Sequence, residues 1–161
     1  MKTGENLATE WNNRVLVALT AHYDAARHYN NLNYWLGIPA LILTTIVGTT
    51  VFANLSKDVS ENTKLITGLL AIAAAILSAL QTFLKHSERA ERCKVMAARY
   101  SSIGKELEVA LIEPATINKA FLDQIRIKLD QADTDSPSIP SSIRDAARKK
   151  YRISQQPSNN N

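Results

Sequence analysis

Two long apolar runs dominate the pattern of hydrophobic and polar positions. Residues 34–55 and residues 65–84 contain no Asp, Glu, Lys or Arg, and a linker of nine residues separates them. A helix rises ~1.5 Å per residue, so each run is long enough to cross the ~30 Å hydrocarbon layer of a bilayer. Because the linker is so short, the pattern predicts two antiparallel transmembrane helices. The alternative is a pair of core helices in a soluble bundle, which are usually shorter and interrupted by polar residues at helical period.

The first run opens with two aromatic residues, Tyr34 and Trp35, directly after an Asn-rich segment. Amphipathic rings prefer the level of the lipid headgroups, so these two residues are the predicted interface anchors.

The segments that flank the two runs carry helical stripes of their own. Residues 5–33 contain no Gly or Pro and place apolar residues and His22 at alternating steps of four and three. No helix breaker occurs from Leu69 to Ile103, so the second span is predicted to continue into a long cytoplasmic helix, residues 85–112. This helix carries a matching stripe, which we expect to pack either on the first stripe or on copies from other subunits. Its candidate oligomer seam consists of Met96, Tyr100, Ile103 and Leu107.

Two shorter helices are predicted after Pro114. The first covers residues 117–132 with Thr116 as its N-cap, and the second is a basic helix over residues 142–151 opened by Ser142. Residues 152–161 lack the apolar side chains needed to order them, which predicts a disordered tail. The expected fold is therefore all-α, with residues 1–151 forming a single membrane domain.

The charge distribution predicts the topology. The net charge is +4 and the isoelectric point is about 9.3. Seven Lys and Arg residues lie just before the first span or just after the second, whereas the linker between the spans contains two. The positive-inside rule then places both termini in the cytoplasm. Because that rule already explains the basic cluster after the second span, no nucleic-acid partner is expected.

Catalytic and metal-binding patterns are missing from the sequence. It contains no nucleophile with a base, no glycine-rich phosphate loop, no metal-ligand cluster and no pair of carboxylates in an apolar setting. We therefore expect neither an enzyme nor a cofactor. Cys93 falls on the packing stripe and is interpreted as structural. The spacing of His22 and His28 does not suit a zinc pair, so we expect a packed His22 and a surface His28.

A stripe of small and polar residues follows one face of the second span. It consists of Thr67, Ala71, Ala74, Ser78, Gln81 and Lys85. Small residues in a membrane helix usually mark close helix packing, here against the first span. Gln81 and Lys85 favour a second interpretation, in which several subunits place this stripe around a water-filled path.

Three segments carry a resemblance to a known family. HYDAARHYNNLNYWLGIPALILTTIVGTTVF, HSERAERCKVMAARYSSIGKELE and IPSSIRDAARKKY resemble the SLATT family, the SMODS/SLOG-associating two-transmembrane effector domains of bacterial conflict systems. The resemblance covers residues 20 to 151 and is carried by helix faces, not by catalytic signatures.

The resemblance implies a helical hairpin in the inner membrane that oligomerises and permeabilises the membrane in antiphage defence. The resemblance also implies a separate sensor or nucleotide-signal protein that detects infection. The expected function is an oligomeric pore-forming effector whose partners are the lipid bilayer and further copies of itself. The alternative is a non-conducting membrane anchor or adaptor that recruits a partner through its cytoplasmic helices.

Overall fold

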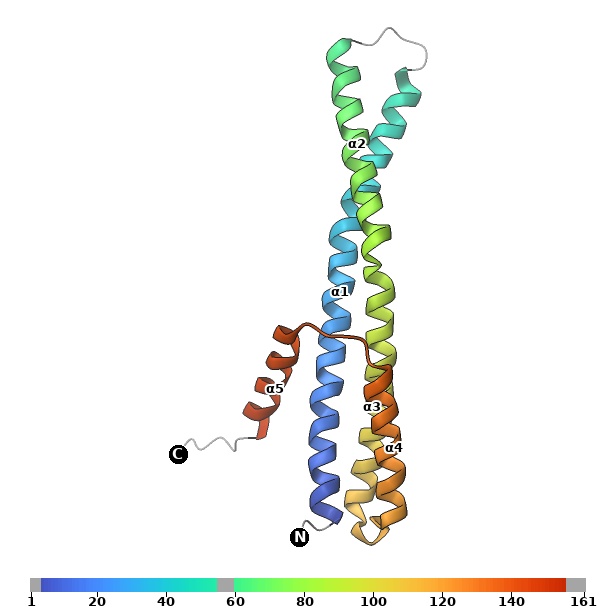
Figure 1. The fold of residues 1–161 in the computed structure, drawn as a ribbon. Coiled ribbons are helices and arrows are strands. Elements are labelled where there is room, and N and C mark those ends of the chain that lie inside the picture. Colours follow the sequence, from blue (N-terminus) through green and yellow to red (C-terminus); the bar gives the residue numbers. More distant parts are fainter. Residues whose placement is uncertain (1–3, 55–59, 156–161) are drawn as a thin grey trace, which may run out of the picture. The chain divides into compact units, whose positions relative to one another are not determined.

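The protein is helical throughout the part that the structure describes. This computed structural model describes residues 4–54 and 60–155, and within them no strand occurs. The elements are α1 (Gly4–Asn54), α2 (Glu61–Leu84), α3 (His86–Ile112), the short 3-10 helix η1 (Pro114–Thr116), α4 (Lys119–Asp135) and α5 (Ser141–Gln155), shown in Figure 1. The all-α prediction is confirmed.

The chain divides into two compact units. The bundle unit comprises the described residues up to 28 and from 89 onward, and the span unit comprises those between 29 and 88. Helix α1 contributes its first half to the bundle unit and its second half to the span unit.

The core of the bundle unit is formed by α1, α3 and α4. Side chains spaced by three, four or seven residues on each helix meet there, as ridge-and-groove packing requires. The buried cluster consists of Ala8 and Val15 from α1, Met96, Tyr100, Ile103 and Leu107 from α3, and Ile125 and Ala132 from α4. The predicted packing of the stripe on residues 5–33 against the stripe after the second span is confirmed in this unit.

Helices α3 and α4 run antiparallel, and ion pairs join them at two levels. Lys128 Nζ lies 2.8 and 2.5 Å from the two carboxylate oxygens of Glu106, and Arg99 pairs with Asp135. Because these pairs are exposed, each contributes about 1 kcal/mol or less. Gly104 of α3 faces Val15 of α1. A Cβ at this position would lie 3.3 Å from Val15 Cγ1, so glycine allows α1 and α3 to approach closely.

Helix α4 begins two residues later than predicted. Thr116 ends η1, and its hydroxyl donates to the carbonyl of Glu113 at 2.8 Å. The N-cap is Asn118, whose side-chain oxygen accepts from the backbone N–H of Phe121 at 2.9 Å. The prediction of Thr116 as the cap was wrong, because Pro114 starts a separate 3-10 turn that ends with Thr116.

Helix α5 packs on α1. Ala147 is fully buried, and the hydroxyl of Tyr151 donates to Asn13 Oδ1 at 2.6 Å. The helix begins at Ser141, one residue before the predicted start, and the carbonyl of Pro140 accepts from the N–H groups of Ile143 and Arg144. It continues to Gln155, so residues 152–155 are helical, contrary to the predicted tail. Residues 156–161 lie outside the described residues.

The span unit joins the second half of α1 to α2. Its buried apolar residues are both small, Ala40 and Ala74. Gly37 of α1 lies against the side chain of Gln81 of α2. A Cβ on Gly37 would come within 2.8 Å of Gln81 Nε2. Small residues thus mark the places where the two helices approach most closely. The central residues of the predicted linker, 55–59, lie outside the described residues.

The predicted continuous helix from the second span onward was wrong at one position. Lys85 adopts a left-handed conformation with φ 47° and ψ 40°, which ends α2 at Leu84 and starts α3 at His86. A non-glycine residue in this region costs about 1–2 kcal/mol. Next to the break, His86 is buried and stacks on Tyr29 with the ring centroids 6.1 Å apart, a contact that holds the break in place.

The core assignment predicts that truncating two isoleucines of α4 changes the free energy of unfolding by very different amounts. Ile125 is fully buried, whereas Ile127 is about half exposed. Ile125→Ala should reduce the free energy of unfolding by about 2–5 kcal/mol, because it leaves a cavity among α1, α3 and α4. Ile127→Ala removes the same atoms from the surface and should change it by about 0.5 kcal/mol or less. Thermal and denaturant unfolding in mild detergent measures both, and equal losses would contradict the assigned core.

Candidate functional site

The span unit presents a large apolar surface. The uncharged runs of its two helices expose large hydrophobic side chains, up to 80% for Trp35 and 83% for Phe83. The exposed residues on α1 are Tyr34, Trp35, Ile38, Leu41, Ile42, Ile46 and Val51, and those on α2 are Leu65, Ile66, Leu69, Ile72, Ile76, Leu80 and Phe83. A soluble protein rarely exposes so many large apolar residues together.

Two helices are long and apolar enough to cross a membrane, and almost none of their apolar stretch is buried in the protein. The core helix of a soluble bundle would instead be covered by its neighbours. This exposure indicates a membrane protein, and it places both predicted anchors, Tyr34 and Trp35, on the exposed surface.

The threonines of these helices bond to their own backbone. The hydroxyls of Thr45, Thr49 and Thr50 each donate to the carbonyl four residues earlier, at 2.8 to 2.9 Å. Thr82 of α2 does the same to Ser78 at 3.0 Å. A hydroxyl satisfied within its own helix can face hydrocarbon at little cost, so these polar residues are compatible with a lipid environment.

The predicted stripe on the second span divides between two surroundings. Ala74 is buried, Thr67, Ala71 and Gln81 are half-buried, and Gln81 lies over Gly37 of α1. Ser78 and Lys85 are exposed, and the Lys85 ammonium lies 3.6 Å from Glu88. On the first span, a Cβ at Gly48 would meet no described atom within 4 Å, so this glycine is not a point of close approach.

The candidate oligomer seam lies inside a single chain. Met96, Tyr100, Ile103 and Leu107 are all buried in the core of the bundle unit. Of the two arrangements that the sequence left open, packing within the chain accounts for these four residues. An assembly of several copies therefore needs other surfaces.

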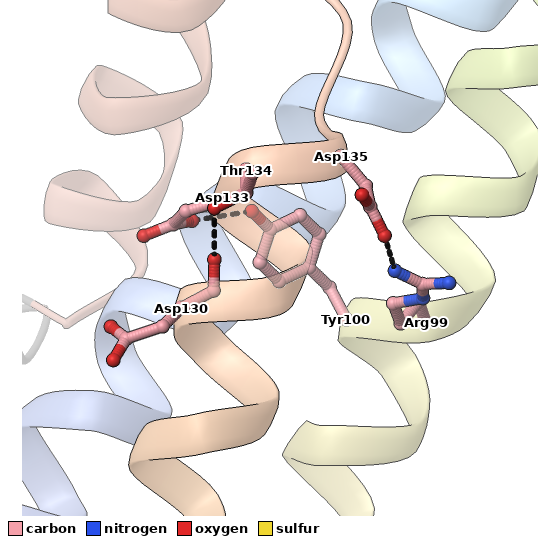
Figure 2. A network of polar contacts seen from close by, with 6 residues as sticks. All are labelled: Arg99, Tyr100, Asp130, Asp133, Thr134 and Asp135. Atoms are coloured by element: carbon pink, nitrogen blue, oxygen red, sulfur yellow. Dashed lines mark hydrogen bonds and ion pairs between the residues drawn. The ribbon is translucent and has the colours of Figure 1, made fainter.

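A polar cluster lies in the bundle unit where α3 contacts the end of α4. Its members are His22, Tyr100, Asp133 and Ser136. The Tyr100 hydroxyl donates to Asp133 Oδ1 at 2.6 Å, and the preceding residue, Arg99, pairs with Asp135, as Figure 2 shows. On the other side of Tyr100, the His22 ring of α1 stacks on the phenol ring at 5.4 Å. His22 Nε2 also shares a 2.9 Å hydrogen bond with Ser136 Oγ. The cluster thus ties three helices to the α4–α5 connection.

Burial determines the protonation of this cluster. Burial, together with the hydrogen bond to Asp133, holds the pKa of Tyr100 well above its ordinary value, so the phenol remains a donor. Burial and the nearby Arg144 guanidinium lower the pKa of His22, and the Asp133 carboxylate opposes them in part. His22 is therefore neutral, and its Nδ1 atom is buried without a hydrogen-bond partner.

Cys93 lies in the interior of the bundle unit, as expected for a structural cysteine. Its side chain is buried, and burial raises the pKa of the thiol. The exposed position expected for His28 and the packed position expected for His22 are also confirmed. Among the described residues, no group of three His, Cys, Asp or Glu side chains is arranged to hold a metal ion.

Sequence reasoning missed two members of the polar cluster, Asp133 and Ser136. Both belong to a turn-rich segment that was interpreted only as a break between helices. Their partners lie 33 and 114 residues away along the chain, and no local pattern indicates such contacts.

A comparison with known protein families, curated proteins and solved structures finds no match.

The neutral His22 predicts a pH dependence of stability. Because its folded-state pKa is lowered, the unfolded chain binds more protons below the ordinary histidine pKa of about 6.5. This stability is fully present above that pH and is lost as the pH falls through the folded-state pKa. We expect a lower melting temperature at about pH 5 than at about pH 7.5.

The control for this prediction is a second histidine on the same helix. His22→Gln should flatten the pH dependence, whereas His28→Gln, a change at an exposed position, should leave it intact. Melting curves from circular dichroism in detergent report both variants. A pH profile that His22→Gln leaves unchanged would show that another group causes it.

Proposed function

We propose that this protein is a two-span membrane effector that assembles into a homo-oligomer and permeabilises the membrane. The observation that carries the proposal is the exposed apolar surface on the uncharged runs of both helices. The resemblance to the SLATT family supports the rest: a bacterial inner-membrane location, a role in antiphage or other conflict systems, and a separate sensor partner. The charge distribution supports a hairpin with both termini in the cytoplasm.

Conduction requires several copies, because two helices cannot enclose a water path. Within one span unit, Ala74 and Gln81 are engaged by packing between the helices, while Ser78 remains exposed. In an assembly, Ser78 is therefore the member of the stripe best placed to face water. Lys85, exposed at the end of α2, would add positive charge at the cytoplasmic mouth and favour anions.

A specific observation also favours the alternative, a non-conducting anchor or adaptor. Gln81 lies against Gly37 of α1 and Thr67 is half-buried, so half of the polar residues of the stripe are not freely available to line a pore. In that case the bundle unit would hold a partner at the membrane surface. The two functions differ in whether ions cross the bilayer.

Flux through liposomes distinguishes them. Purified protein reconstituted into sealed liposomes should release a trapped dye or dissipate an ion gradient, alone or after addition of the products of its genomic neighbours. Inserted protein that leaves the gradient intact under both conditions would favour the anchor.

Two neighbouring positions on α2 sharpen the same experiment. In a Cys93→Ser background, a cysteine introduced by Ser78→Cys should react with a water-soluble thiol reagent and reduce the flux. Ile76→Cys is the matched control, because Ile76 is also exposed but belongs to the apolar surface. Equal inertness of both cysteines in a conducting protein would exclude Ser78 from the water path.

A further inference from the structure

A cavity of about 820 Å³ lies within the bundle unit, between α1, α4 and α5. Its polar wall is the cluster around Tyr100, and its apolar wall includes Trp11, Ala18 and Leu129. Sites for small molecules usually measure about 300–1,000 Å³ and combine apolar walls with a few polar groups. In size, this cavity therefore matches a small-molecule site, and its lining is more highly charged than that of most such sites.

Four arginines from three helices converge on the cavity. Arg14 belongs to α1, Arg126 to α4, and Arg144 and Arg148 to one face of α5. In the described part of the chain, the Arg14, Arg144 and Arg148 side chains form no ion pair or hydrogen bond with another side chain. Arg126 has a 3.8 Å contact with Asp123, in which both side chains are mostly exposed, so the pair holds the guanidinium weakly.

Three carboxylates offset most, but not all, of the charge of these arginines. Glu10, Asp130 and Asp133 also line the cavity, which leaves an excess of positive charge. Asp133 accepts the short hydrogen bond from Tyr100. Four guanidinium groups against three carboxylates leave the lining with one net positive charge, which favours a bound anion.

A buried polar atom in the cavity wall also lacks a partner. The His22 ring is almost completely buried and lines the cavity, and its Nδ1 atom has no hydrogen-bond partner. A buried polar atom without a partner costs about 1–3 kcal/mol, so such atoms are uncommon in proteins. A ligand hydroxyl or a phosphate-bound proton could satisfy it.

We propose that this cavity binds a small molecule carrying phosphate groups, with the guanidinium groups of Arg14, Arg144 and Arg148 holding the phosphate oxygens. A guanidinium matches phosphate with two parallel hydrogen bonds, and several of them suit an anion with more charge than one carboxylate. The inference goes beyond the proposed membrane function and does not depend on conduction. Because α1 carries both Arg14 and the first apolar run, the ligand would contact a helix that continues into the span unit.

Titration of the full-length protein with inorganic tripolyphosphate tests the proposal. In nanodiscs of neutral phosphatidylcholine, calorimetry should give saturable binding with a Kd below about 1 mM. Arg144→Gln combined with Arg148→Gln should weaken binding roughly 100-fold, and Arg14→Gln alone roughly tenfold, because each removes charge-assisted hydrogen bonds. Arg14 lies on a different helix, so its variant keeps the test valid if α5 is disturbed.

The matched control is Lys149→Gln combined with Lys150→Gln. It removes the same charge from the same helix at two exposed positions that do not line the cavity. Wild-type affinity in this control supports the site. The proposal is overturned by absence of saturable binding to the wild type, or by an equal loss in the lysine control, which would indicate nonspecific charge attraction.

A second set of nanodiscs identifies the source of the phosphate. If anionic lipid headgroups supply it, phosphatidylglycerol in the disc should compete with tripolyphosphate in the wild type and should not affect the Arg144/Arg148 variant. If the ligand is a soluble phosphate ester, the wild-type Kd should be the same in both kinds of disc once ionic strength is matched. Competition that persists unchanged in the arginine variant would contradict binding in this cavity.

Discussion

Hydrocarbon offers no hydrogen-bond partners, and this constraint explains most of the span unit. Every backbone N–H and C=O inside a bilayer must be satisfied by the protein, which favours uninterrupted helices. Helix α1 runs through its apolar stretch without a break, even past Pro39, and α2 is continuous from Glu61 to Leu84. Thr45 and Thr82 obey the same constraint, because their hydroxyls donate to carbonyls of their own helix. The left-handed residue, Lys85, comes only after the apolar run has ended.

The bundle unit follows the rules of a protein in water. Its three core helices bury one face each and leave charged side chains outside, and their apolar contacts supply the driving force that the span unit lacks. The polar cluster of His22, Tyr100, Asp133 and Ser136 fixes the end of α4 and the start of the connection to α5. That connection in turn allows α5 to bring Arg144 and Arg148 to the cavity. The proposed ligand site thus depends on a short network of partly buried polar contacts.

Periodicity was sufficient to predict the helices and their buried faces. Apolar runs and steps of three and four residues predicted the two long apolar helices, the stripe containing Val15 and the stripe containing Leu107. The same stripe could not reveal its partner, because a face that packs within the chain and one that packs between copies have the same composition. The intramolecular burial of Met96 and Ile103 was therefore a finding of the structure.

Features that depend on contacts between distant residues were not predictable. The break at Lys85 has no glycine or proline to mark it, and the His86–Tyr29 stacking that accompanies it joins residues 57 positions apart. The choice of Asn118 over Thr116 as a cap depended on a competing 3-10 turn. The cavity combines arginines from three helices whose proximity no local pattern encodes.

The central claim, that the two apolar runs form a hairpin across a membrane, is tested most directly by a reporter enzyme that is active only outside the cytoplasm. Inserted into the linker between the runs, the reporter should be active, and fused after Asn161 it should be silent, because both termini are expected on the cytoplasmic side. Activity of the C-terminal fusion would contradict the topology. Silence at both positions, with the full-length fusion recovered in the soluble fraction, would contradict membrane insertion itself.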